Sequence, residues 1–305
     1  MNNSINRRDF LKFTSGLAVA GMLPVTLQAA SQLPKRLIPG TSELLPVIGL
    51  GSTKPVMQIP ETGTGPLYDV IQALVEYGGS VIDTAPRSGE IDSEFGKVLQ
   101  DPRWQGRLFV STKVTTTGKQ EGLEQLKLTQ KLFGLQPADL VQVQSMVDNN
   151  THWPTLKQWK EAGGTRYIGV TVSNNDNHAQ IESFMKMESP DFVQINYSVA
   201  ESEAEQRLLP MAEDLGIAVQ INRPFMNGSY FEKTRDLALP DWAAEFDCRS
   251  WAQFSLKYIL AHNAVTCILT ETTKAEHMHD NLQAAFGRLP DAAMKKRMRD
   301  LIINL

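Results

Sequence analysis

The sequence predicts a (β/α)8 barrel, in which eight parallel strands alternate with the helices that surround them. Two observations carry this prediction. Short apolar runs rich in β-branched residues alternate eight times with longer segments of helical period, and the distance between successive runs fits one strand, one helix and the connecting loops. No Gly-x-Gly-x-x-Gly motif follows the first run, which disfavours an open doubly wound sheet, the alternative that the pattern leaves open.

The predicted strands follow one another along the chain after a short N-terminal hairpin. Residues 36–41 and 44–47 predict this hairpin, which would close the N-terminal end of the barrel. Amphipathic segments between the apolar runs predict helices at residues 66–77, 118–133, 201–215 and 250–261. The apolar runs predict strands at residues 46–50, 80–83, 108–113, 139–143, 167–171, 191–195, 217–221 and 264–268.

The composition is that of a folded globular protein: of 305 residues, 42% are hydrophobic and 21% are charged. The chain carries 30 Lys and Arg against 34 Asp and Glu, a net charge of −4, which disfavours nucleic-acid binding. Two cysteines, Cys248 and Cys267, cannot build a disulfide scaffold, although one bridge remains possible. None of the five histidines ends a predicted strand, so no metal site is predicted. The basic run at residues 295–299 is interpreted as the solvated face of a helix.

Residues 1–30 have the pattern of a secretory signal peptide. A basic segment with Arg7 and Arg8 precedes an uncharged stretch at residues 13–27 and a small-residue end. The paired arginines followed by Phe-Leu-Lys resemble a twin-arginine signal, which exports folded proteins. We therefore predict a periplasmic barrel domain at residues 31–305, with the twin-arginine machinery as partner of the precursor. The apolar stretch is too short for a stable membrane span; an uncleaved amphipathic helix is the alternative.

Polar residues at the ends of the predicted strands are the candidates for an active site, because (β/α)8 barrels place their chemistry there. Asp83 ends the second strand and Lys113 ends the third. Side chains at these neighbouring positions should pair inside the barrel. A catalytic pair and a purely structural ion pair both agree with this pattern. Arg87 follows closely, and either favours an anionic ligand at the barrel mouth or is a surface arginine of a loop.

Five segments resemble the aldo/keto reductase family, and they occur in the order and spacing of that family between about residues 36 and 290. The resemblance implies a (β/α)8 barrel that binds NADP(H) and moves a hydride between nicotinamide and a carbonyl, with a small carbonyl compound or alcohol as substrate. The segments are GSVIDTAP at residues 79–86, VSTK at 110–113, RYIGVT at 166–171, FVQINY at 192–197 and TTKAEH…N at 272–281.

The resemblance also implies four catalytic side chains, of which this sequence keeps two. Asp83 matches the aspartate and Lys113 the lysine, but Ser88 stands at the tyrosine position and Gln144 at the histidine position. A serine hydroxyl is shorter and far less acidic than a phenol, whereas a glutamine amide can still donate a hydrogen bond. Two classes of function follow: an exported oxidoreductase with a substitute proton donor, and a non-catalytic barrel that binds a ligand or a protein partner.

The cofactor contacts implied by the resemblance are mixed. Gln194 would hold the nicotinamide carboxamide and Tyr197 would stack on the nicotinamide ring. Glu271 would bring a negative charge beside the pyrophosphate, and Val172 stands where a polar carboxamide ligand is usual. We therefore expect NADP(H) binding to be weakened or lost. The residues implied for the adenosine phosphate end are Thr272, Thr273, Lys274 and Asn281.

Overall fold

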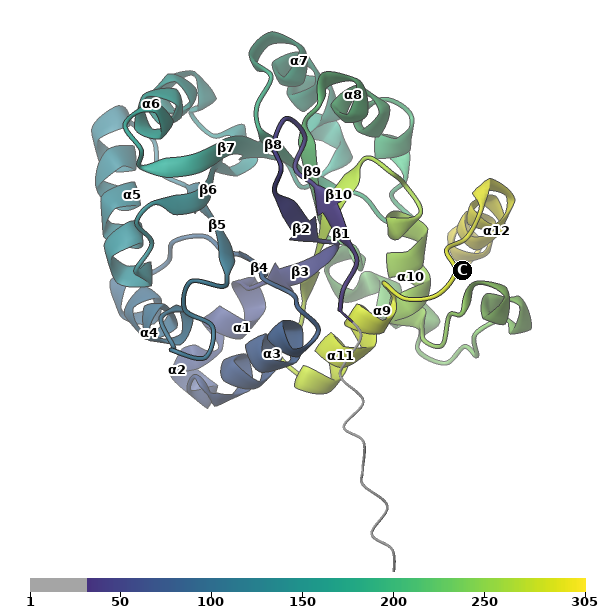
Figure 1. The fold of residues 1–305 in the computed structure, drawn as a ribbon. Helices are drawn as coiled ribbons and strands as arrows, with labels where there is room; N and C mark the ends of the chain where they lie inside the picture. The colour runs from purple at the N-terminus through teal and green to yellow at the C-terminus, as the bar shows by residue number, and fades with distance from the viewer. Residues whose placement is uncertain (1–31) are drawn as a thin grey trace, which may run out of the picture. The chain divides into compact units, whose positions relative to one another are not determined.

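The computed structural model describes residues 32–305 and shows the predicted closed barrel of eight parallel strands. Each strand pairs with the next along the chain, and the last pairs with the first to close the barrel (Figure 1). The strands are β3 (Ile48–Gly51), β4 (Val81–Asp83), β5 (Phe109–Val114), β6 (Ala138–Val143), β7 (Thr165–Thr171), β8 (Phe192–Asn196), β9 (Ala218–Asn222) and β10 (Val265–Glu271). The predicted signal peptide lies outside the described residues.

Helices surround the barrel, as the amphipathic segments predict. The segment predicted at residues 201–215 becomes α-helical only from Leu208, because Glu203–Glu205 form a 3-10 turn first. The helices are α1 (Thr53–Met57), α2 (Ile59–Thr62), α3 (Gly65–Glu76), α4 (Gly89–Leu99), α5 (Lys119–Phe133), α6 (Asn149–Glu161), α7 (His178–Glu188), α8 (Leu208–Leu215), α9 (Ser229–Thr234), α10 (Trp251–Leu260), α11 (Ala275–Gln283) and α12 (Ala292–Ile303).

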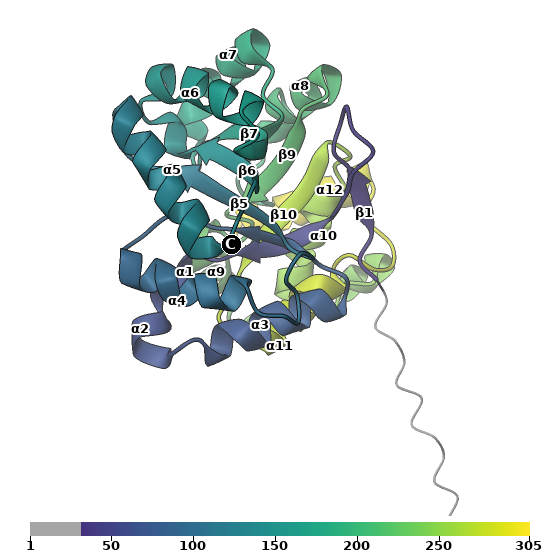
Figure 2. The ribbon, with the colours of Figure 1, turned by 60° about the vertical axis from the view of Figure 1, so that its left-hand side comes forward.

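The predicted hairpin is confirmed, and it closes one end of the barrel. Strands β1 (Lys35–Leu37) and β2 (Leu44–Pro46) pair antiparallel, and Figure 2 shows them at one end of the barrel. Ile38 and Leu45 pack against the apolar side chains at the beginnings of the barrel strands. Arg36 donates hydrogen bonds of 2.6 Å to the Leu260 carbonyl and 2.8 Å to the His262 carbonyl, which joins the hairpin to the end of α10.

Alternation along the strands separates two environments. Outward side chains such as Val193 and Ile195 pack against the helices in a large apolar core. Inward side chains form an apolar cluster at the N-terminal end, where Phe192 and Cys267 lie. Farther along the strands the inward positions become polar, as at Gln194. The barrel therefore has a hydrophobic floor below a polar upper half, and the candidate site lies in that polar half.

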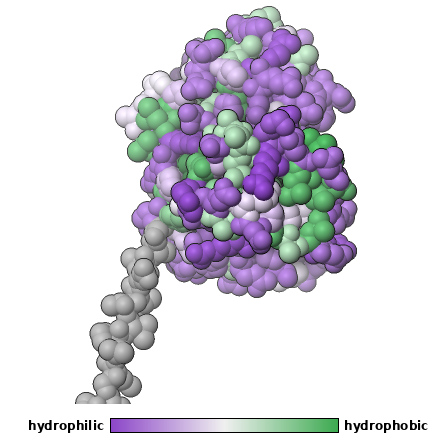
Figure 3. Space-filling view, turned by 90° about the vertical axis from the view of Figure 1, so that its right-hand side faces the viewer, coloured by the Kyte–Doolittle hydropathy of each residue, from purple (hydrophilic) through white to green (hydrophobic). Residues whose placement is uncertain are grey.

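The cysteines and the surface of the barrel complete the description of residues 32–305. No helix in this part of the chain is long and apolar enough to cross a membrane. Cys248 and Cys267 are both buried and free, so the bridge that the sequence left open does not form between them. On the face that carries α12, hydrophilic side chains predominate and hydrophobic ones are gathered in separate patches (Figure 3).

Candidate active site

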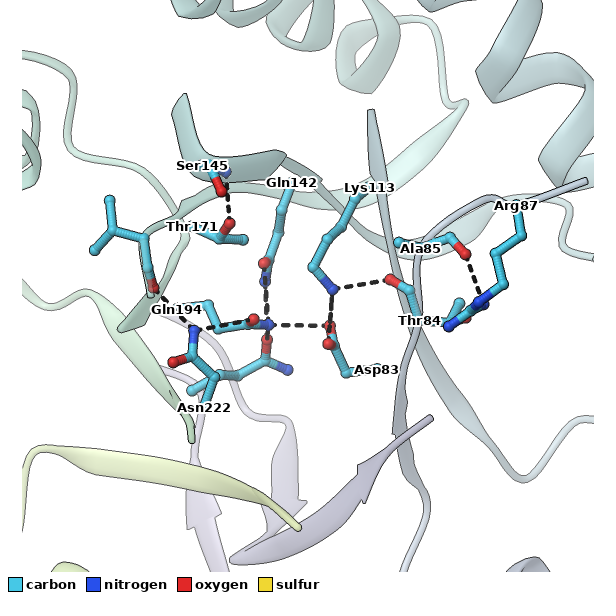
Figure 4. Close-up of polar contacts among 12 residues, drawn as sticks. Asp83, Thr84, Ala85, Arg87, Lys113, Gln142, Ser145, Thr171, Gln194 and Asn222 are labelled. Carbon is cyan, nitrogen blue, oxygen red and sulfur yellow. Dashed lines mark hydrogen bonds and ion pairs between the residues drawn. The ribbon is translucent and has the colours of Figure 1, made fainter. Parts of the chain in front are cut away.

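Asp83 and Lys113 form a buried ion pair, as their adjacent strand ends predict. Asp83 is 8% exposed and Lys113 is 7% exposed. The Lys113 ammonium donates hydrogen bonds of 2.7 and 2.6 Å to the two carboxylate oxygens of Asp83 and one of 2.8 Å to the Thr84 carbonyl (Figure 4). An ammonium has three hydrogens to donate. All three are satisfied within the chain, so Lys113 has none left for a substrate or for a second catalytic group.

A layer of three glutamine side chains extends the ion pair across the barrel. Gln194 Nε2 lies 3.0 Å from Asp83 Oδ1 and 3.3 Å from the side-chain oxygens of Gln142 and Gln220. Gln142 donates a further hydrogen bond of 2.8 Å to Gln220. Sequence reasoning missed Gln142 and Gln220. The signal that finds them is a repeated triplet, Val-Gln followed by Val or Ile, centred on residues 142, 194 and 220.

Asn222, the last residue of β9, lies next to this glutamine layer at the C-terminal end of the strands. Its Nδ2 donates a hydrogen bond of 2.9 Å to the Val172 carbonyl and lies 3.4 Å from Gln194 Oε1 (Figure 4). Its Oδ1 is buried and has no hydrogen-bond partner among the described residues. The side chain of Asn222 is a carboxamide, the same chemical group that the resemblance assigns to Gln194 as ligand. The chain's own amides therefore occupy both hydrogen-bonding ends of Gln194.

The two substituted positions do not join the ion pair. Ser88 is exposed, and its Oγ accepts a hydrogen bond of 3.4 Å from the Ile91 backbone amide, so it is the N-cap of α4. Gln144 follows β6 and is half-buried. Within residues 32–305, neither side chain is hydrogen-bonded to Asp83 or Lys113. The structure thus places both residues near the barrel mouth without building a proton relay through them.

The structure contradicts the stacking role expected for Tyr197. Tyr197 is three residues beyond Gln194, so strand alternation turns the two side chains to opposite sides of the barrel wall. Tyr197 is completely buried among the outer helices. Its hydroxyl donates to Glu205 and lies 3.1 Å from the Lys295 ammonium. Burial, together with the nearby Glu205 carboxylate, raises the pKa of this phenol. Tyr197 therefore belongs to the helical layer and not to the inside of the barrel.

The residues expected at the adenosine phosphate end surround the start of α11. Thr272 is buried and accepts a hydrogen bond of 3.2 Å from the Lys274 backbone amide. Lys274 is exposed, Thr273 is half-buried between them, and Asn281 is buried on the helix. A cation ahead of a helix N-terminus is a suitable arrangement for a phosphate. The Lys274 ammonium also lies 3.6 Å from Glu276 Oε1, a carboxylate in the first turn of α11.

Glu271 is turned away from this phosphate end. Its Oε1 accepts a hydrogen bond of 2.7 Å from the Lys54 backbone amide, in the first turn of α1. This contact joins the end of β10 to α1. The carboxylate is exposed, so its charge is screened by water.

Among the described residues, no group of three or more His, Cys, Asp or Glu side chains is placed to hold a metal ion.

Comparison with known proteins agrees with this barrel. The model of the aldo/keto reductase family matches residues 48–299, and the chain therefore belongs to that family. Aldo-keto reductase YhdN of Bacillus subtilis is 27% identical over 169 residues, 48% of each chain. The NADH-specific methylglyoxal reductase of Escherichia coli is 25% identical over 163 residues, which cover 45% of this chain and 49% of the relative. The matches span about half the length of these two relatives.

Solved structures show the same fold at lower sequence identity. The aldo-keto reductase of Klebsiella pneumoniae, solved in complex with NADPH, superposes with a TM-score of 0.71. It is 17% identical, and the match covers 89% of this chain and 96% of that chain. The family and the barrel are thus established. The particular activity of this chain depends on the side chains at its own barrel mouth.

Proposed function

We propose that this protein is an aldo/keto reductase-family barrel that binds NADP(H) weakly and no longer performs conventional carbonyl reduction. The observation that carries the proposal is that, within residues 32–305, neither Ser88 nor Gln144 is hydrogen-bonded to the buried Asp83–Lys113 pair. The proton-donor position is held by Ser88, whose hydroxyl caps a helix. Loss of a general acid slows a reaction by about 10²- to 10⁴-fold, or roughly 3–5 kcal/mol of barrier.

Weak cofactor binding follows from the contrast between the two ends of the site. At the nicotinamide end, Gln194 is engaged by Asp83 and Asn222, so a cofactor carboxamide has to displace a chain contact. At the phosphate end, Lys274 ahead of α11 is exposed, and its ion pair with the equally exposed Glu276 is one that a phosphate group can replace. We expect the remaining affinity to come from this phosphate end. If any reaction survives, its substrate is a small carbonyl compound or alcohol.

Titration of the purified protein with NADPH and NADH, followed by cofactor fluorescence, tests the binding half of this proposal. Lys274→Met is the informative variant, and Lys296→Met on the exposed face of α12 is its matched control. We expect weak, millimolar-range binding that Lys274→Met weakens further. Tight binding that Lys274→Met leaves unchanged would contradict the proposal. No binding at millimolar cofactor would favour the second candidate, a non-catalytic barrel for another ligand or a protein partner, which the saturated ion pair also supports.

We also propose that the precursor is exported to the periplasm by the twin-arginine machinery. The support is the order of the N-terminal segment: Arg7 and Arg8, an uncharged stretch and small residues. A double change of Arg7 and Arg8 to Lys keeps the charge and removes the paired arginines. Cell fractionation should find the unchanged chain in the periplasm and the double variant in the cytoplasm. Equal export of both chains would reject this route.

A further inference from the structure

Arg87 is a partly buried arginine at the barrel mouth, beside the ion pair. Its Nη1 donates hydrogen bonds of 3.1 Å to the Thr84 hydroxyl and 2.8 Å to the Ala85 carbonyl, which fix the guanidinium against its own loop. Thr84 also accepts from the Lys113 ammonium through its backbone carbonyl. Figure 4 shows Arg87 on the far side of Thr84 from the ion pair. Two cationic groups therefore contact one buried residue at the rim of the site.

The carboxylates near Arg87 do not form a salt bridge with its guanidinium, although Asp92 Oδ1 is buried and has no hydrogen-bond partner among the described residues. Asp83 is bonded to Lys113, Glu271 accepts from the Lys54 backbone amide, and Asp92 accepts from the Arg87 backbone amide at 2.8 Å rather than from its side chain. Within residues 32–305, no carboxylate lies within salt-bridge distance of the guanidinium. Burial lowers the pKa of Arg87, and the charges of Asp92, Asp83 and Glu271 act in the opposite direction. An arginine side chain remains charged in this setting.

The unused edge of Arg87 has the geometry of a carboxylate site. Nη1 takes both chain contacts, and Nε and Nη2 have no hydrogen-bond partner among the described residues. These two nitrogens form the edge of a guanidinium that binds a carboxylate in a bidentate manner. We infer that Arg87 binds the carboxylate of a small ligand at the mouth of the barrel. The inference depends on the proposed function only in placing the ligand at that mouth, and it needs no cofactor.

The charges around Arg87 favour a monoanion over a phosphate dianion. Asp83, Asp92 and Glu271 all lie close enough to influence the charge of the guanidinium. Their repulsion grows with the charge of the ligand. A planar carboxylate also needs only the one free edge that Arg87 offers. The ligand class is thus a small carboxylic acid.

Saturation-transfer NMR with acetate as probe tests the inference on the full chain without cofactor. Acetamide, a neutral molecule of the same shape, is the control ligand. Arg87→Gln removes the charge, and Arg87→Lys keeps it but removes the two-pronged edge. Arg103→Gln is the matched control variant, because Arg103 is exposed, is paired with Asp101 and lies beyond the other end of α4. Titration of the acetate signal gives an apparent Kd for each protein.

We expect acetate to bind more tightly than acetamide, and Arg87→Gln to raise the acetate Kd about tenfold or more. Arg87→Lys should raise it less, and Arg103→Gln should leave it unchanged. The inference is overturned if Arg87→Gln binds acetate as well as the unchanged protein does, or if the protein does not distinguish acetate from acetamide. If Arg87→Gln fails to fold, an unaltered acetate Kd in Arg87→Lys overturns it as well. Cofactor titration is independent of these outcomes, so the two proposals can fail separately.

Discussion

At the scale of single residues, the hydrogen bonds within the chain determine which polar groups of the site remain available to a ligand. Lys113 has no ammonium hydrogen left, and Gln194 is bonded at both ends of its amide. The sequence predicted the positions of Asp83 and Lys113, because strand ends are readable from apolar runs. It did not predict the saturation of Lys113, because a backbone carbonyl such as that of Thr84 leaves no trace in the residue pattern.

The buried ion pair should be worth much more to stability than a surface pair. Asp83→Asn leaves the buried Lys113 ammonium without its counter-charge, so we expect the free energy of unfolding to fall by about 3–5 kcal/mol. Asp101→Asn is the matched control, because Asp101 pairs with Arg103 at the surface, where water screens the charges, and its loss should lower the free energy of unfolding far less. Guanidinium denaturation of the two variants measures the difference. Similar losses in both would show that the Asp83–Lys113 pair is not a structural anchor.

Asn222 provides a second test at this scale, because its amide competes for Gln194. Asn222→Ala removes the contacts to Gln194 Oε1 and to the Val172 carbonyl, so we expect NADPH to bind several-fold more tightly. A hydrogen bond of this kind is worth about 1 kcal/mol. Fluorescence titration measures the affinity, and Asn304→Ala at the exposed C-terminus is the control. Unchanged or weaker binding in Asn222→Ala would show that this amide does not limit cofactor binding.

At the scale of elements, the eight strands, the hairpin and most helices were predictable because their apolar periodicity is strong. The direction of side chains along a strand was also predictable. Alternation from Gln194 places Tyr197 outside the barrel, whereas the family resemblance led us to expect it inside. The basic run on α12 was interpreted as a solvated face. Lys296 and Arg297 are exposed, as that interpretation expects, but Lys295 is only 14% exposed and bonds Glu205 at 2.7 Å, and the Arg297 guanidinium lies 4.3 Å from the centre of the Trp242 ring. Contacts between distant elements have no local signature.

The contact of α12 with Glu205 predicts a pH-dependent stability. Burial raises the pKa of Glu205, but hydrogen bonds from Lys295 and Tyr197 outweigh this and hold it below its ordinary value. A carboxyl with a lowered folded pKa stabilises the protein above its unfolded pKa and loses that contribution as pH falls through the folded value. Glu205→Gln should therefore lower the free energy of unfolding by roughly 1–3 kcal/mol at neutral pH and by much less in acid.

Denaturation midpoints of Glu205→Gln and the unchanged protein, compared at neutral pH and at a pH below the ordinary pKa of a glutamate, measure this effect. Glu213→Gln, on the exposed face of α8, is the control for removal of one carboxylate. The stability difference between Glu205→Gln and the unchanged protein should shrink as the pH falls. A difference that stays constant with pH would mean that the Glu205 charge does not hold α12.

At the scale of the whole molecule, the barrel has the architecture of the aldo/keto reductase family. The hairpin closes the N-terminal end through Ile38 and Leu45, and the strand ends still bring Asp83 and Lys113 together. Fold and family follow from patterns spread over most of the chain. Activity depends on a few positions, and the proposed loss of the proton donor concerns Ser88 and Gln144 alone.

The most direct test of this account is the rate of NADPH-dependent aldehyde reduction by the unchanged protein and by the double variant Ser88→Tyr with Gln144→His. The absorbance of NADPH is followed at high cofactor concentration, so that weak binding does not conceal turnover. We predict no reduction above background for the unchanged protein and a gain of about 100-fold or more in the double variant. Turnover by the unchanged protein equal to that of the double variant would contradict the account.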